Sequence, residues 1–322
     1  MSVHRAQQMT GVAGLLLLGL TFAPDAEARM RCSYRGPPQN LLTVTADRGA
    51  LGEIIRSGQK IVVREFLERP SPCQGGVPTV LNTDTIAVFP SGDDDFVDVL
   101  LGGGSFAPGA TPETEGASEI EIEFEGRDAF GEVGGTRRAD EFHWGPGAGN
   151  HAGLNLNPRD AGDQDVDVTV RGGPFAFLVA TGARGNDTIV PAPGAPFRND
   201  GVFSEGGRGD DRLIAPPNSG GILDGGAGDD VLVGGRQDDN LLGGDGNDRL
   251  QGAGGPDLIA AGQGRDLIFG GPGRDTINSG ADVPGGLPRD SARDRIGCGA
   301  GRDRVKTDGQ DQLRGCEVIR RR

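Results

Sequence analysis

Six aspartates recur every nine residues between Gly225 and Asn278, in the units GGAGDDVLV, GGRQDDNLL, GGDGNDRLQ, GAGGPDLIA, AGQGRDLIF and GGPGRDTIN. The sixth position of each unit is aspartate: Asp230, Asp239, Asp248, Asp257, Asp266 and Asp275. The eighth position is always leucine or isoleucine. A fixed period of this kind predicts a stacked repeat fold, in which residues at equivalent positions lie above one another.

Stacked carboxylates are suited to binding a hard cation. If two units make one coil, turns eighteen residues apart stack, which places Asp230, Asp248 and Asp266 in one column and Asp239, Asp257 and Asp275 in another. Neighbouring carboxylates would then lie about 4.8 Å apart and repel each other without a cation. Carboxylates and backbone carbonyls form an all-oxygen shell, which suits calcium better than zinc or copper and better than magnesium.

The elements that must position these aspartates are a turn of six residues and a strand of three. Glycines at positions one, two and four allow the tight turn, and position eight points inward from the short strand. One buried aliphatic side chain per nine residues is too small a core to offset the entropy of ordering the backbone. We therefore expect cation binding to be part of folding.

The periodic pattern extends beyond the six units. GGRGDDRLI at 206–214 is a complete unit, and GARGNDTIV at 182–190 is nearly one. Residues 216–224 form a degenerate unit that keeps Leu223 at the aliphatic position, with one extra residue between 206 and 225. After an interruption, units at 289–297 and 298–306 resume, with Ile296 and Val305 in register.

The unit resembles GGxGxDxUx, the nonapeptide of the haemolysin-type (RTX) calcium-binding repeat family. The resemblance implies an all-β fold, a right-handed parallel β-roll or β-solenoid, with several Ca²⁺ ions held between successive turns by the sixth-position aspartates and by turn carbonyls. Gln237, Ala253 and Ala261 replace turn glycines, so we expect strain there. Carried over by register, the implied metal ligands are Asp187, Asp211, Asp230, Asp239, Asp248, Asp257, Asp266 and Asp275, followed by Asp294 and Asp303. Arginines precede the last two aspartates, so we expect their units to be structural more than metal-loaded.

The chain divides into four predicted parts. Residues 1–28 have an apolar run and an AxA pattern typical of a cleaved secretory signal. Residues 29–180 alternate apolar and polar residues in LLTVT, EIEIEFE and VDVTV, which predicts a β-rich cap and a degenerate solenoid, with a helical turn at 48–57. The calcium-binding β-roll covers 181–281, and degenerate repeats with a basic cap cover 282–322.

The four cysteines remain after cleavage of the signal, and an even number in an exported chain favours disulfides. Three pairings are open. We expect the local one, Cys32 with Cys73 and Cys298 with Cys316, so that one bridge staples each end of the molecule.

The composition restricts the partners. A formal net charge of −15 makes nucleic acid a poor partner, although residues 289–322 carry ten Arg or Lys against six Asp or Glu. No segment after the signal is long and apolar enough to span a membrane. We expect a secreted, extracellular monomer, with a cell surface or a polysaccharide as the alternative partners.

No catalytic motif is evident. GxSxG, HExxH and a phosphate-binding loop are absent, and Asp93, Asp94 and Asp95 lack EF-hand spacing. His143 and His151 match no zinc-ligand spacing. We expect a non-enzymatic calcium-binding protein. The alternatives are a hydrolase with an unrecognised site in 29–180, and an adhesin or matrix protein.

Overall fold

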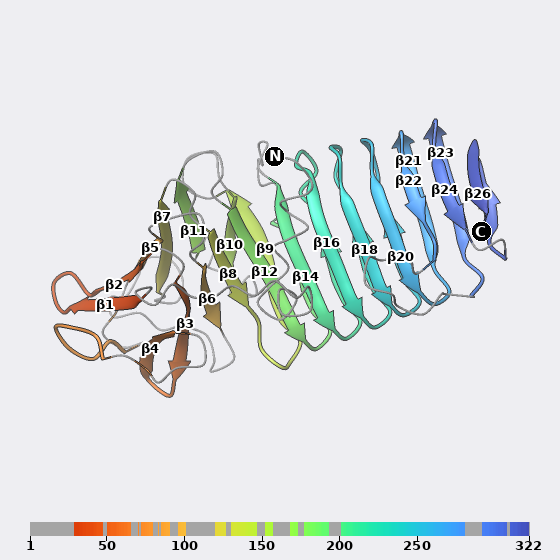
Figure 1. Cartoon of the computed structure of the whole chain (residues 1–322). Coiled ribbons are helices and arrows are strands. Elements are labelled where there is room, and N and C mark those ends of the chain that lie inside the picture. The colour runs from red at the N-terminus through yellow and green to blue at the C-terminus, as the bar shows by residue number, and fades with distance from the viewer. Residues whose placement is uncertain are drawn as a thin grey trace.

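The computed structural model describes residues 29–321, apart from 48–49, 66–69, 71, 80–82, 84, 91–95, 101–119, 127–129, 147–151, 157–167, 173–176, 193–200, 281–291 and 308–309. The predicted signal at 1–28, the acidic residues Asp93 to Asp95 and His151 lie outside this set. The described residues form strands and turns only. Two sheets run side by side along an elongated roll, from the N-terminal end to the C-terminal end (Figure 1). The all-β prediction is confirmed.

The first sheet has fourteen strands among the described residues, in the order β1 (Met30–Arg35), β2 (Leu41–Ala46), β5 (Thr85–Pro90), β7 (Glu121–Gly126), β11 (Val168–Gly172), β10 (Ala152–Asn155), β9 (Glu141–Pro146), β13 (Thr188–Pro191), β15 (Arg212–Ile214), β17 (Val231–Val233), β19 (Arg249–Gln251), β21 (Leu267–Gly273), β23 (Arg295–Gly301) and β25 (Gln312–Arg314).

The second sheet has twelve such strands, in the order β4 (Lys60–Glu65), β3 (Leu51–Ser57), β6 (Phe96–Leu100), β8 (Phe130–Gly134), β12 (Phe177–Arg184), β14 (Val202–Arg208), β16 (Gly221–Ala227), β18 (Asn240–Asp245), β20 (Leu258–Gln263), β22 (Thr276–Asn278), β24 (Arg304–Thr307) and β26 (Val318–Arg321). From β12 onward the chain alternates between the two sheets, and the strands from β12 to β26 pair with one another in parallel only.

The predicted eighteen-residue coil is present. Leu232 pairs with Leu250 and Leu250 with Ile268 in one sheet, while Leu223 pairs with Leu241 and Leu241 with Ile259 in the other. The predicted slip of one residue is also confirmed, because Leu213 pairs with Leu232, nineteen residues away. The interruption adds ten residues to one coil, yet Ile268 still pairs with Ile296 and Ile277 with Val305.

The core between the sheets is a ladder of single aliphatic side chains in the repeats. Leu223, Leu232, Leu241, Leu250 and Ile259 are all fully buried. The N-terminal half has larger core residues, among them Phe124, Phe142 and Trp144. The inward strand positions therefore carry the same hydrophobic core from one end of the roll to the other.

The N-terminal end is made of two hairpins, β1–β2 and β3–β4. The predicted helical turn at 48–57 is wrong, because Leu51–Ser57 is strand β3. The spacing of Leu51, Ile54 and Ile55 imitates a helix, but β3 pairs with β4 on one side and with β6 on the other, and Ile54 is buried between the sheets. Cross-strand pairing therefore overrides the local pattern.

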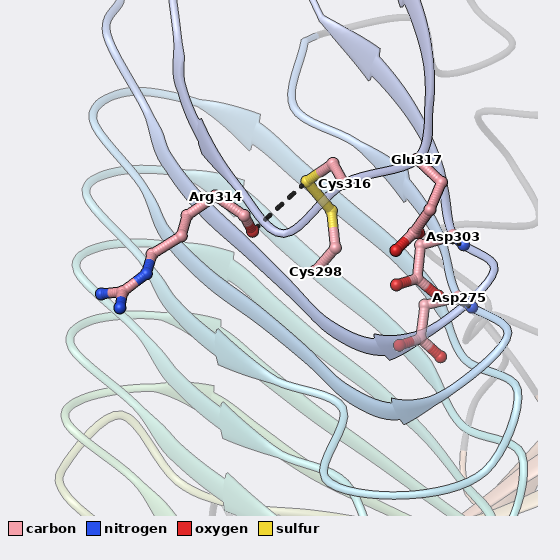
Figure 2. Close-up of a disulfide and its surroundings, with 6 residues drawn as sticks. All are labelled: Asp275, Cys298, Asp303, Arg314, Cys316 and Glu317. Atoms are coloured by element: carbon pink, nitrogen blue, oxygen red, sulfur yellow. Dashed lines mark hydrogen bonds between the residues drawn. A yellow bond between two sulfur atoms is a disulfide. The ribbon is translucent and has the colours of Figure 1, made fainter.

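Each end carries one of the predicted disulfides. Cys32, on β1, bonds to Cys73 across 41 residues. Cys298, on β23, bonds to Cys316, which lies just before β26, across 18 residues. Figure 2 shows the second bridge between a regular coil and the last segment of the chain, where the Cys316 sulfur also lies near the Arg314 carbonyl. Both predicted pairings are confirmed.

Candidate metal-binding columns

The sixth-position aspartates form two hydrogen-bonded columns, one along each edge of the roll. In the first column, which we call column A, each backbone N–H donates to Oδ1 of the aspartate one coil further on. Asp230 N–H donates to Asp248, and Asp248 N–H donates to Asp266, at 2.8 and 2.9 Å. The same bond links every successive pair in the series Asp140, Asp187, Asp211, Asp230, Asp248, Asp266, Asp294 and Asp311.

Column B, on the opposite turns, is shorter. It begins with the N–H of Gly221, which donates to Asp239 because the degenerate unit 216–224 has glycine at position six. The series then runs through Asp239, Asp257, Asp275, Asp303 and Glu317. The last three side chains lie in line in Figure 2. The predicted division of the aspartates into two columns is therefore confirmed.

The second oxygen of most column carboxylates is buried and has no hydrogen-bond donor. This holds for Oδ2 of Asp187, Asp211, Asp230, Asp248, Asp257, Asp275 and Asp303. The aspartates themselves are almost fully buried, with exposed fractions of 0 to 3%. A buried carboxylate oxygen without a donor or a cation is costly, so these atoms need a ligand that the described protein groups do not supply.

All of these oxygens except that of Asp303 have a backbone carbonyl of the next coil beside them. A Cβ added to Gly225 would lie 2.4 Å from Asp230 Oδ2 and 2.7 Å from the Gly243 carbonyl oxygen, so both oxygens converge on the space that the glycine leaves free. The same convergence at position one occurs throughout, pairing Asp187 with Gly206, Asp211 with Gly225, Asp230 with Gly243, Asp248 with Ala261, Asp239 with Gly252, Asp257 with Gly270 and Asp275 with Cys298.

The electrostatics of the columns oppose ionisation in the absence of a cation. Burial raises the pKa of Asp230 to about 8. The nearby carboxylates of Asp248 and Asp211 raise this pKa further, whereas the hydrogen bond from the Asp211 N–H lowers it. Burial likewise raises the pKa of Asp257 to about 8. The raised pKa values show that negative charge is unfavourable here unless a positive charge accompanies it.

The donor set fits a hard cation. Each level offers a carboxylate oxygen and a carbonyl oxygen, both of which calcium prefers. Among the described residues, no three His, Cys, Asp or Glu side chains gather at one point, so backbone oxygens must complete any shell. Soft or borderline metals, which require thiolate or imidazole ligands, do not match this set.

Two turns differ from the rest. In these, Oδ2 of the aspartate already accepts a hydrogen bond from the backbone: Asp140 from the N–H of Thr136, and Asp239 from the N–H of Gly235, both at 2.6 Å. Asp311 Oδ2, at the C-terminal end of column A, accepts the side-chain hydroxyls of Ser279 and Thr307 instead. We call the Asp140 and Asp239 turns closed, and we call the turns with a donor-free Oδ2 open. The sequence marks the Asp239 turn only by Gln237 in place of the position-four glycine, and it does not predict the hydrogen bond to Asp239 Oδ2.

Three members of the columns were missed in the sequence. Asp140, Asp311 and Glu317 occupy position six, and Phe142, Leu313 and Ile319 follow two residues later at the aliphatic position. This pairing of an acidic residue with an aliphatic or aromatic residue two positions on was the available signal, but each unit keeps only one of the three turn glycines, Gly135, Gly309 and Gly315 respectively.

His143 lies on β9, outside the columns. Its Nε2 is 3.3 Å from Glu141 Oε1, and both side chains are partly exposed. The arrangement is a surface contact between neighbours on one strand, and it brings no further metal ligand.

The fold and the two columns define a parallel β-roll whose stacked turns present carboxylate and carbonyl oxygens to a cation. Residues 221–250 and 251–283 match the family model of the RTX calcium-binding nonapeptide repeat (4 copies). Residues 221–283 thus consist of RTX calcium-binding repeats. Neither the curated proteins nor the solved structures gave a match. Within the described residues, no helix has the length and apolar character needed to cross a membrane.

Proposed function

We propose that this is a secreted, non-enzymatic protein whose β-roll folds when Ca²⁺ binds along the two columns. The observation that carries the proposal is the set of open turns, in which a buried, donor-free Oδ2 meets a carbonyl oxygen of the next coil. Calcium would neutralise the carboxylates. The side chains that would hold it are those of Asp187, Asp211, Asp230, Asp248, Asp257 and Asp275, with Asp266 and Asp303 continuing the columns.

The core supports a folding role for the ion. Each repeat buries one aliphatic side chain, such as Leu241 or Leu250, while its turn buries an aspartate. The hydrophobic contribution per repeat is small compared with the entropy of ordering nine residues. Binding energy of a ligand that recognises only the folded state then adds directly to stability.

Secretion is supported by the two disulfides and by the signal-like segment at the N-terminus. Extracellular calcium modules commonly bind the ion at about 0.1 to 1 mM, a range in which the roll would be folded outside the cell. A role on a cell surface or a polysaccharide, and the absence of catalysis in 29–180, stay predictions.

The test is circular dichroism of the mature chain, stripped of metal, during titration with calcium and, separately, with magnesium. We expect the β-sheet signal to rise with calcium and to respond far less to magnesium. A full β-signal in the stripped protein that calcium leaves unchanged would refute calcium-driven folding.

A further inference from the structure

We propose that the residue at position four decides whether a turn binds calcium, and that Gln237 keeps the Asp239 turn closed, so that column B has an empty level. The inference rests on the proposed function, since it concerns which of the aspartates serve it. Asp239 has the same position, burial and column as Asp257. The two turns differ in the backbone donor that Asp239 Oδ2 receives and in the backbone angles at positions two and four.

The open turns share one backbone arrangement. Position two is left-handed in all of them, with φ between 72 and 112° at Ala183, Gly207, Gly226, Gly244, Ala253 and Gly271. Position four is always glycine, and Gly185, Gly209, Gly228, Gly246 and Gly255 are left-handed there, with φ between 113 and 147°. Gly273 is the exception in φ, but a Cβ on it would lie 1.9 Å from the Gly255 carbonyl oxygen.

The two closed turns lack glycine at position four. Arg138 occupies it in the Asp140 turn, and Gln237 occupies it in the Asp239 turn. Neither turn has a left-handed residue at position two or four, although the Asp239 turn has glycine, Gly235, at position two. Glycine at position two is therefore insufficient to open a turn, whereas a side chain at position four accompanies closure in both cases.

The physical reason lies in the path of the backbone. A residue with a Cβ enters the left-handed region only at a cost, so Gln237 avoids the conformation that glycine adopts at position four. The turn then follows a different path and directs the N–H of Gly235 at Asp239 Oδ2. Together with the Gly221 N–H at Oδ1, this bond satisfies both oxygens of the carboxylate. A cation would have to displace a backbone donor that the open turns do not place there.

The test counts the calcium ions bound per chain, by equilibrium dialysis at saturating calcium followed by elemental analysis. Gln237 is exposed, so it can be replaced without disturbing the core. We expect Gln237→Gly to bind one ion more than the wild type. Gln237→Ala, which removes the long side chain but keeps a Cβ, is the matched control and should bind no additional ion. Adding Asp239→Asn to Gln237→Gly should remove the gain.

Two single variants separate this inference from the proposed function. Asp257→Asn should lose one ion and Asp239→Asn none. A wild-type chain that binds no calcium would overturn the proposed function itself. If calcium binds and Asp239→Asn loses an ion as Asp257→Asn does, or if Gln237→Gly gains none, the closed turn is refuted. Hydrogen exchange at saturating calcium gives a second readout, since the Gly235 amide should be protected in the wild type and should lose that protection in Gln237→Gly.

Discussion

Each aspartate of an open turn has two separate tasks, one for each carboxylate oxygen. Oδ1 accepts a backbone N–H from the preceding coil, as in the bond from Asp230 to Asp248, and Oδ2 faces the carbonyl of the following coil. The first task needs only an acceptor, which an amide also provides, whereas the second needs a negative charge to attract a cation. The two can therefore be separated by a substitution that removes the charge alone.

Asp248→Asn should keep the acceptor for Asp230 and lose the charge. We expect the calcium midpoint of folding to rise roughly tenfold, because a charged interaction of this kind contributes about 1.5 to 3 kcal/mol. Asp238→Asn, an equal charge change at an exposed position of the closed turn, is the control and should shift the midpoint little. Equal midpoints for Asp248→Asn and Asp238→Asn in the dichroism titration would contradict this role.

The raised pKa values predict how the ion-free protein responds to pH. Burial raises the pKa of Asp187 and Asp239 to about 7 and of Asp211 and Asp248 to about 6. A native pKa above the unfolded value near 3.8 means that the folded chain binds more protons, so its stability falls as pH rises from about 4 through 6 to 8. Metal-stripped protein should therefore hold more β-structure at pH 5 than at pH 8.

Calcium and protons then compete for the same oxygens. Calcium affinity should fall as pH decreases from 8 to 6, and binding at pH 7 should release protons. Calorimetry in two buffers with different ionisation enthalpies measures this release as a difference in apparent binding enthalpy. Identical enthalpies in both buffers would show that the carboxylates are already ionised before calcium arrives.

At the scale of the element, each repeat strand contributes one inward side chain and little else. Leu250 on β19 is fully buried between its partners Leu232 and Ile268, whereas Leu258 on β20 points outward and is 36% exposed. Stacking of such short strands therefore depends on a single contact per strand and on the turns at either end.

Leu250→Ala should destabilise the calcium-loaded roll by about 2 to 5 kcal/mol, the usual cost of a leucine-sized cavity in a core. Leu258→Ala should cost much less, because its side chain is largely solvated. Urea unfolding at fixed, saturating calcium measures both. Similar losses for the two variants would show that the inward ladder is not the main apolar contribution.

Elements with a strong period were predictable, and those whose state depends on distant partners were not. The nine-residue period of aspartate and leucine predicted the two columns. It also predicted the one extra residue before Leu232 and the in-register pairing of Ile296 and Val305 after the interruption. Prediction was possible because equivalent side chains must stack in every coil. Strand β3 was not predictable from Ile54 and Ile55 alone, since its pairing with β4 and β6 decides it. The closed state of Asp239 was not predicted, because Gln237 at position four marks the turn as unusual but does not show which backbone N–H Asp239 Oδ2 receives.

At the scale of the whole molecule, the two disulfides hold the parts of the chain that the repeats do not. The Cys298–Cys316 bond joins the fully buried Cys298 to the last segment, which forms only the short strands β25 and β26. The Cys298 carbonyl is also the oxygen that meets Asp275 Oδ2, at the last converging pair of column B. Cys298 thus takes part both in the C-terminal disulfide and in the pair of oxygens beside Asp275.

Replacing Cys298 and Cys316 by serine should destabilise the calcium-loaded protein by about 3 kcal/mol, the value expected for closing a loop of this length. It should also weaken calcium binding at the Asp275 level. The matched change at Cys32 and Cys73 should lower stability but leave the calcium isotherm unaltered, because that bond is remote from both columns. An isotherm that both pairs of substitutions shift equally would contradict a local coupling at the C-terminal end.

Between β13 and β26 the spacing between paired aliphatic residues varies, from fourteen residues between Val305 and Ile319 to twenty-eight between Ile277 and Val305. Extra residues are accommodated outside the stacked strands without changing what pairs with what. The number of coils can therefore change without altering the fold. A tandem duplication of residues 243–260 would add one strand to each sheet and one aspartate to each column. Such a protein could grow by gene duplication in whole coils while its ends, and the bonds that secure them, stay the same.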